Sequence, residues 1–326
     1  MADPATSSDL RYGYFGPRGT FSEMALATVP GAGLAQAEAI STVDAALAAV
    51  RSGSVDAVMV PIENSVEGGV TATLDALATG EPLVILREAL VPITFVLAAR
   101  AGVRVEDVRR VGSHPHAWAQ CRGWAARTLP QAVYVPTLST ASAAAGLADG
   151  AEERASYDAA LCAPIAADIN RLSVLAHDVG DNPSAVTRFV LVARPGPVPA
   201  PTGADKTTLV AYQTDDHPGG LVEMLEQFAV RGVNLTRLES RPTGDALGQY
   251  CFSIDCEGHI AEARVGEALM GLHRTCARVT FLGSYPRAVA PGRVNGSTSP
   301  SRRPGTSEAD FTAAHEWIAK LRAGGA

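Results

Sequence analysis

The chain has 326 residues, of which 47% are hydrophobic, so it is long enough for two or three modest domains with separate cores. Its net charge of −7 argues against nucleic acid as a partner, because phosphate binding needs a basic face. Residues 90–99 form the longest apolar run, about half of the roughly 20 residues that span a bilayer. Residues 1–10 are polar and lack the apolar core of a secretory signal. We therefore expect a cytoplasmic protein that binds neither nucleic acid nor membrane.

The first region, residues 11–194, alternates short apolar strands with alanine-rich helical stretches, which is typical of an α/β fold. Strands are expected at 12–15, 55–61, twice within 83–99, and at 133–135, 159–163 and 187–192. Helices are expected to begin at Thr20, near Ser41, at Pro115, near Ser139 and at Pro164. Several polar motifs directly follow strands, where α/β sheets bind ligands. If the chain forms one lobe, crosses to a second and returns, these motifs meet in the cleft between the lobes.

Capping signals set some of these helix limits. Thr20 with Glu23 has the pattern of a capping box, and Ser41 with Asp44 is a second candidate start. Gly53 is placed as a C-cap. The helix from Pro115 is expected to reach about residue 128, and the helix from Ser139 to end by residues 149–150.

A Pro/Gly-rich linker at 195–205 separates a second compact region, residues 206–287. Its expected strands cover 207–213, 234–242, 249–256 and 279–283, and its helices 221–231 and 261–273. This β-α-β-β-α-β order predicts a ferredoxin-like α+β domain. Residues 291–306 are predicted to be disordered. A final helix at about 307–321 would place Phe311, Ala314, Ile318 and Leu321 on one face, docked on the protein or on a neighbouring subunit.

Individual motifs are ambiguous. The loop 16–20, with Gly19 and Thr20, suits an anion at a helix start, although any strand-to-helix turn needs a glycine and an N-cap. Asn64 and Ser65 end a strand and either form a polar site or close an ordinary turn. His114 and His116 lack a third ligand nearby, which favours a hydrogen-bonding histidine over a metal site.

Ser139 and Thr140 suit both a helix cap and an anion site. Residues 178–189 are the most informative stretch, since a polar loop leads directly into an apolar strand. There Arg188 can clamp a carboxylate and Thr187 can donate a hydroxyl, or both are ordinary strand-edge residues. The five cysteines are scattered and odd in number, which predicts reduced thiols, with neither a disulfide framework nor a zinc site.

The order of these motifs resembles prephenate dehydratases over residues 12–287. The resemblance is carried by residues 16–22 (GPRGTFS), 61–65 (PIENS), 113–115 (SHP), 139–141 (STA), 181–183 (DNP) and 187–189 (TRF). It implies a catalytic region at 10–195, two-lobed like type II periplasmic binding proteins. It also implies an ACT regulatory domain at 206–288, where residues 239–242 (ESRP) resemble a phenylalanine-recognition motif. The resemblance does not extend to residues 289–326, which are predicted from the sequence to form a flexible tail with a terminal helix.

By resemblance, the enzyme is a carbon–oxygen lyase that converts prephenate to phenylpyruvate, CO2 and water in L-phenylalanine biosynthesis. No cofactor is implied, because aromatisation drives the step. Thr187 would assist the leaving hydroxyl, and Phe189 would pack against the ring or the core. The residues implied to hold or orient the substrate are Gly19, Thr20, Asn64, Ser65, Ser139, Thr140 and Arg188. His116 stands where the family often has glutamine.

Feedback by L-phenylalanine is implied at paired ACT domains, which requires a homodimer or homotetramer. The implied contacts are Gly219, Gly220, Leu221, Val222, Asn234, Leu235, Glu239 and Ser240. Two rival functions stay open. One is arogenate dehydratase, with an ammonium in place of the substrate keto group, and the other is a non-catalytic amino-acid-sensing binding protein.

Overall fold

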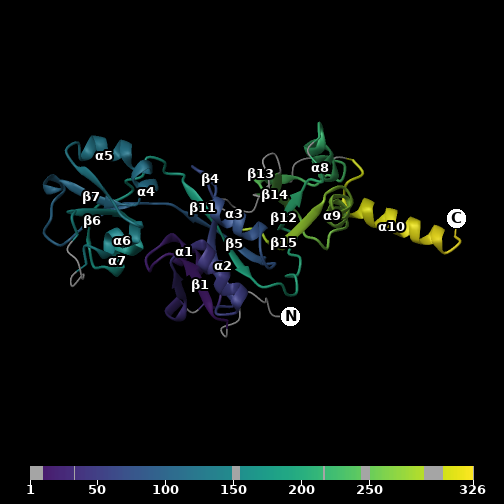
Figure 1. Ribbon diagram of the computed structural model, residues 1–326, viewed down its shortest axis with the longest axis horizontal. Helices are drawn as coiled ribbons and strands as arrows, with labels where there is room; N and C mark the ends of the chain where they lie inside the picture. The colour runs from purple at the N-terminus through teal and green to yellow at the C-terminus, as the bar shows by residue number, and fades with distance from the viewer. Residues whose placement is uncertain are drawn as a thin grey trace. The chain divides into compact units, whose positions relative to one another are not determined.

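A computed structural model describes residues 10–32, 34–148, 155–215, 217–243, 250–289 and 304–325. The chain forms two compact units. The first comprises Thr6–Val70 and Ala89–Val190, and the second Met1–Ala5, Thr71–Glu88 and Leu191–Ala326. The predicted helix end at 149–150 and most of the predicted disordered segment, residues 291–303, lie outside the described residues. Figure 1 labels the elements.

Two sheets belong mainly to the first unit, although residues 84–88 and 191–193 of the larger sheet are part of the second unit. The larger has the order β2-β1-β3-β11-β5, with β4 paired to β3 and β1 parallel to both β2 and β3. Its strands are β1 (Tyr12–Phe15), β2 (Glu38–Ile40), β3 (Ala57–Asn64), β4 (Gly68–Gly69), β5 (Val84–Pro92) and β11 (Val186–Ala193). The associated helices are α1 (Phe21–Ala27), α2 (Val43–Ser52) and the short 3-10 helix η1 (Leu34–Gln36). β3 is apolar over residues 57–62 and β11 over residues 189–193, as is typical of strands that are buried on both faces.

The second sheet of this unit has the order β10-β6-β9-β7-β8. Its strands are β6 (Val96–Ala99), β7 (Arg110–Ser113), β8 (Val133–Pro136), β9 (Ala159–Cys162) and β10 (Ser173–Ala176). Its helices are α4 (Pro115–Gln120), α5 (Arg122–Thr128), α6 (Thr140–Ala145), α7 (Pro164–Ile169) and the 3-10 helix η2 (Val105–Asp107). Buried Leu97, Val111 and Leu161 belong to one core cluster of this sheet.

The helix predicted from Pro115 to residue 128 is two helices that meet at Cys121. The second begins there because the Asp181 carboxylate caps it, accepting from Gly123 N and Trp124 N at 2.7 Å each. A carboxylate at a helix N-terminus satisfies backbone N–H groups that otherwise lack partners. The single-helix prediction was wrong because the cap comes from a residue far away in the sequence.

The other predicted caps have mixed outcomes. Gly53 is the C-cap of α2 with φ of 77°, as predicted, but the N-cap is Thr42 and not Ser41. Thr42 Oγ1 accepts from Ala45 N at 3.1 Å. Pro164 opens α7 as predicted, and Ser139 caps α6.

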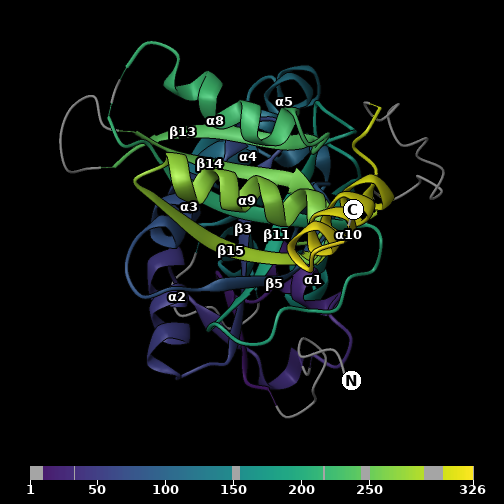
Figure 2. The same cartoon turned by 90° about the vertical axis from the view of Figure 1, so that its right-hand side faces the viewer.

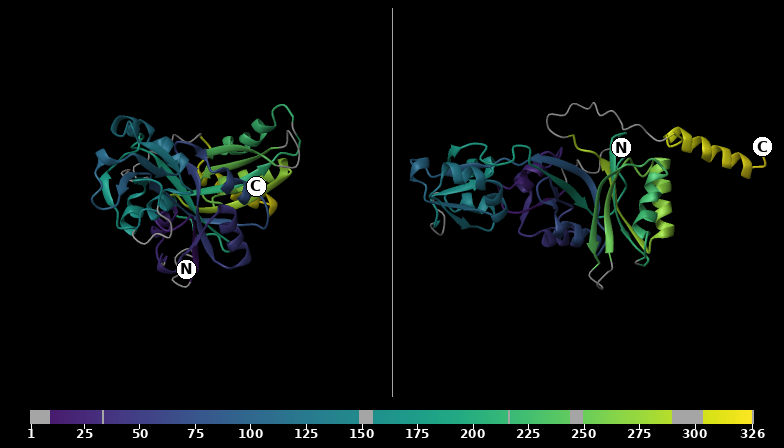
Figure 3. Two further views of the ribbon diagram at one scale, coloured as in Figure 1. Left: turned by 60° about the vertical axis from the view of Figure 1, so that its left-hand side comes forward. Right: turned by 90° about the horizontal axis from the view of Figure 1, so that it is seen from above.

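The second unit contains a β-α-β-β-α-β arrangement, as predicted, with strand order β13-β14-β12-β15 and antiparallel pairing. Its elements are α3 (Thr71–Ala78), β12 (Asp205–Tyr212), α8 (Gly220–Ala229), β13 (Leu235–Pro242), β14 (Tyr250–Glu257), α9 (Ala263–Thr275), β15 (Arg278–Pro286) and α10 (Glu308–Arg322). Helices α8 and α9 cover one face of this sheet (Figures 2 and 3). The core between these two helices and the sheet includes Leu209, Phe228, Ile254 and Leu272.

The terminal helix α10 begins after Ser307, where Ser307 and Asp310 form a capping box. Its start contacts α9, since Glu308 Oε1 accepts from Ala263 N at 2.7 Å. The rest of α10 leaves Trp317 59% exposed, and Ile318 and Leu321 are exposed as well. Within the described residues, none of the helices has the length and apolar character needed to cross a membrane. The five cysteines are free.

Candidate functional site

A pocket of about 250 Å³ lies in the first unit, where residues from both of its sheets meet. It is placed where β1, β3, β7 and β8 end, and where β11 begins. Six predicted site residues line it: Thr20, Asn64, Ser139, Thr140, Thr187 and Phe189. The structure thus brings these six residues together in one pocket.

Thr187 and Asn64 form the polar centre of this pocket. The Asn64 Nδ2 amide donates to the Thr187 hydroxyl oxygen at 2.8 Å. Asn64 Oδ1 accepts from Val66 N at 2.7 Å and Glu67 N at 3.3 Å, which fixes the orientation of the amide. Thr187 is only 6% exposed. Because its oxygen accepts from Asn64, the Thr187 hydroxyl proton remains available for a group in the pocket.

The glycine loop before α1 is arranged differently from the predicted capping box. Thr20 is the N-cap but its side chain makes no capping bond, and its hydroxyl donates to Pro17 O at 3.0 Å. Glu23 Oε2 instead accepts from Gly19 N at 2.6 Å, one residue earlier than the motif specifies. Gly19 has φ of 84°, a conformation that favours glycine, and is not among the lining residues. The Glu23 carboxylate therefore already accepts from the Gly19 N–H group, which was expected to face a bound anion.

Ser139 and Thr140 enter the pocket from the start of α6. Ser139 Oγ accepts from Ser142 N at 2.9 Å, and Ser142 Oγ accepts from Ser139 N at 2.8 Å. The hydroxyl of Ser139 therefore serves the helix cap first. Thr140 is the more available hydroxyl of the two.

Arg188 and Ser65 do not line this pocket. Successive side chains of a strand point to opposite faces, so a pocket lined by Thr187 and Phe189 excludes Arg188. Arg188 is 5% exposed and pairs with Glu63 at 3.3 Å. Ser65 joins the end of β3 to the start of β11, where its hydroxyl accepts from Val186 N at 3.0 Å. Both residues support the frame around Thr187, and their positions give no support for direct contact with a ligand.

Two histidines at the start of α4 line the pocket, and the sequence had left their roles open. His114 is the N-cap of α4, where its Nδ1 accepts from His116 N at 3.4 Å. The two rings stack with centroids 5.1 Å apart. Burial lowers the pKa of His114, and the neighbouring His116 lowers it further. Among the described residues, no group of three or more His, Cys, Asp or Glu side chains is placed to hold a metal ion.

The remaining lining residues were not predicted from the sequence. They include the aromatic side chains of Phe15, Phe21 and Phe95 and the amide of Gln120. Phe21 and Phe95 meet edge to face at 5.7 Å. Gln120 lies four residues after His116 and thus shares its helix face, which was a usable signal. Phe21 lies in the motif at 16–22 but was given no role. Phe15 and Phe95 had no signal, because a buried aromatic residue usually belongs to the core.

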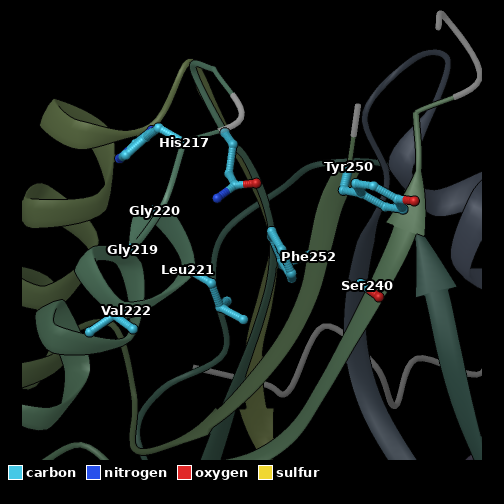
Figure 4. Close-up of a pocket in the computed structure, with 9 residues that line it drawn as sticks. His217, Gly219, Gly220, Leu221, Val222, Ser240, Tyr250 and Phe252 are labelled. Atoms are coloured by element: carbon cyan, nitrogen blue, oxygen red, sulfur yellow. The ribbon is translucent and has the colours of Figure 1, made fainter. Parts of the chain in front are cut away.

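A second pocket of about 360 Å³ lies in the second unit at the start of α8. Figure 4 shows Gly219, Gly220, Leu221, Val222 and Ser240 around it, together with His217, Tyr250 and Phe252. Gly219 is the N-cap of α8 with φ of 96°. The five residues named first were predicted effector contacts, and the structure brings them together.

Three other predicted effector contacts do not line this pocket: Asn234, Leu235 and Glu239. Leu235 packs against the core beneath α8 and α9. Glu239 lies 3.6 Å from Arg237 and 4.0 Å from Arg241, its neighbours two positions away on the same strand face. Ser240 lies on the other face and reaches the pocket. His217, which was not among the predicted contacts, has its pKa raised by hydrogen bonds to the Asp215 backbone and to Glu223.

Together these features define an α/β protein with a polar, partly aromatic pocket in one unit and a β-α-β-β-α-β sheet with its own pocket in the other. A model of the prephenate dehydratase family matches residues 12–197, more than half of the chain. The chain belongs to the prephenate dehydratase family.

Individual relatives agree with this assignment. The prephenate dehydratase of Amycolatopsis methanolica is 46% identical over 315 residues, covering 96% of this chain and 98% of the relative. The structure of the Arthrobacter aurescens prephenate dehydratase in complex with L-Phe is 56% identical with a TM-score of 0.84, covering 96% of this chain and 99% of that one.

A structure described as a novel type of quorum quenching acylase is 29% identical with a TM-score of 0.74, covering 85% and 98% of the two chains. The fold alone therefore does not identify the reaction, and the residues of the pocket must be used to identify it.

Proposed function

We propose that this protein dehydrates and decarboxylates prephenate to phenylpyruvate in L-phenylalanine biosynthesis. The observation that carries the proposal is the Thr187 hydroxyl, buried in the pocket and held by Asn64 at 2.8 Å. Family membership supports the same reaction.

The chemistry needs little more than correct placement. The C–O bond to the ring hydroxyl breaks as the ring carboxylate leaves as CO2, and the electron pair of the broken C–C bond completes the aromatic ring. The departing oxygen gains a proton and leaves as water. Thr187 donates a hydrogen bond to that oxygen, and the Asn64 amide polarises the hydroxyl by donating to it. Because a threonine hydroxyl is a weak acid, its contribution is mainly electrostatic stabilisation of the leaving group.

The rest of the pocket has supporting roles in this proposal. Thr20 and Thr140, at the starts of α1 and α6, offer polar groups to the substrate carboxylates. Phe189 packs against the ring. Arg188 and Ser65 hold the strand that carries Thr187, through Glu63 and Val186.

We also propose that the second unit contains an ACT regulatory domain at 206–288 that binds L-phenylalanine, with the catalytic region at 10–195 and a tail at 289–326. The pocket formed by Gly219–Val222 and Ser240 is the candidate effector site. The Arthrobacter relative was solved with L-Phe. Asn234, Leu235 and Glu239 lie outside the pocket of one chain, which suits a site completed by a second copy. The proposal thus includes a homodimer or homotetramer in the cytoplasm.

The testing experiment is an absorbance assay for product with prephenate and, separately, with arogenate, each with and without L-phenylalanine. We expect phenylpyruvate from prephenate, a higher kcat/KM for prephenate than for arogenate, and inhibition by L-phenylalanine. A reversed preference would identify an arogenate dehydratase. Binding of L-phenylalanine without turnover of either substrate would identify an amino-acid sensor.

A further inference from the structure

The charge of the pocket around Thr187 does not match its proposed substrate at first sight. Prephenate has two carboxylates, yet the lining residues, all of which the structure describes, include neither arginine nor lysine. The only lining side chains that can become cationic are His114 and His116. A carboxylate in a partly buried site is strongly favoured by a paired cation.

Of these two histidines, His114 is unsuited to carry the charge. Burial and the neighbouring His116 both lower its pKa. Its Nδ1 also accepts from the backbone N–H of His116, which requires that nitrogen to be unprotonated. His114 is therefore a neutral ring that donates, if at all, from Nε2.

His116 has the opposite surroundings. Its Nδ1 lies 2.5 Å from Glu67 Oε2, an ion pair when the ring is protonated. A carboxylate beside one ring nitrogen fixes a proton on that nitrogen and orients the ring, as in other carboxylate–histidine pairs. A proton on Nε2 can then be donated to a ligand. The His116 side chain is 62% exposed, so a ligand can reach it.

Glu67 is also fixed relative to the reacting centre. Its backbone N–H donates to Asn64 Oδ1 at 3.3 Å, and the Asn64 amide donates to Thr187. The carboxylate that orients His116 and the amide that orients the Thr187 hydroxyl thus belong to one short loop after β3. His116 itself comes from α4, next to the other sheet of the same unit.

We infer that His116, oriented by Glu67, binds a carboxylate of the substrate. His116 is then a specificity-determining residue and Glu67 its positioning residue. The inference rests on the proposed function, because it takes the substrate to be a dianion. It gives a direct role to a pocket position where this chain has histidine and the family often has glutamine.

A double-mutant cycle tests this inference on the full chain with prephenate as the probe. We expect His116→Gln to raise KM about 10-fold and to change kcat by less than about 3-fold. The variant loses a contact to the bound substrate, but it keeps the groups that take part in the chemical step. Glu67→Gln should raise KM by about 5-fold. The double variant should be no worse than His116→Gln alone, because Glu67 acts only through His116.

Glu106→Gln is the matched control, since Glu106 is an exposed acid paired with Arg104 at 3.9 Å in the same unit but away from the pocket. Its KM should equal that of the wild type. An unchanged KM in His116→Gln, or KM effects of the two single changes that multiply in the double variant, would overturn the inference. Absence of phenylpyruvate from the wild type would instead refute the proposed function, so the two failures are distinguishable.

Discussion

Replacing Thr187 with valine removes one hydroxyl and nearly preserves the shape of the side chain. In the folded protein the loss leaves Asn64 Nδ2 without the acceptor that now lies at 2.8 Å. Because Asn64 is only part-buried, water can take up that donor, so the free energy of unfolding should fall by only about 1 kcal/mol.

The effect on catalysis should be much larger. Losing the group that stabilises the leaving oxygen should lower kcat by about 10²–10⁴-fold, with a smaller effect on KM. At about 1.4 kcal/mol for each factor of ten, this is roughly 3–5 kcal/mol on the activation barrier. The barrier therefore changes by several times more than the stability, and a folded but inactive enzyme is expected.

The assay is steady-state release of phenylpyruvate by purified Thr187→Val, with thermal unfolding measured on the same sample. Thr187→Ser is the control, since it keeps a hydroxyl at the same backbone position and should retain a substantial part of the turnover. A valine variant that turns over prephenate at close to the wild-type kcat would refute the reasoning and remove Thr187 from the reaction.

Three further changes test other parts of the structure. Glu239→Ala should raise the L-phenylalanine concentration needed for half-inhibition while uninhibited turnover stays the same; unchanged inhibition would remove Glu239 from the effector site. Lys206→Met breaks a pair at 2.8 Å with Glu88, whose side chain is 1% exposed. It should lower the free energy of unfolding, measured in urea, by about 3–5 kcal/mol, because it leaves a buried charge without its partner. Lys320→Met on exposed α10 is the control and should leave the free energy of unfolding unchanged. Ser139→Ala removes the N-cap of α6 and should cost about 1 kcal/mol in thermal unfolding, and an unaltered melting temperature would contradict the capping role.

Much of the fold followed from the sequence where the signal was local. The β-α-β-β-α-β order of residues 205–286 was predicted because its strands and helices have clear periods and lengths. β2 and β10 have only three and four residues. They were not predicted, because a segment this short does not show a clear hydrophobic periodicity. β7 was missed for another reason, since Gly112 is a poor strand residue. It fits there because the Tyr157 ring lies where a side chain would be, 2.7 Å from the position of an added Cβ.

The site shows the same division. Thr187, Asn64 and Thr140 were predicted from motifs at element ends, and all three line the pocket. Arg188 could not share a face with Thr187, and strand alternation alone would have shown this. The Glu67–His116 pair joins residues 49 positions apart from different elements, so no local pattern could predict it.

The most direct test of the central claim is product analysis of prephenate incubated with the full-length protein. We expect one phenylpyruvate and one CO2 for each prephenate consumed, at a rate that exceeds the reaction without protein and falls when L-phenylalanine is added. Folded protein that leaves prephenate unchanged, or that consumes it without releasing CO2, would contradict the claim.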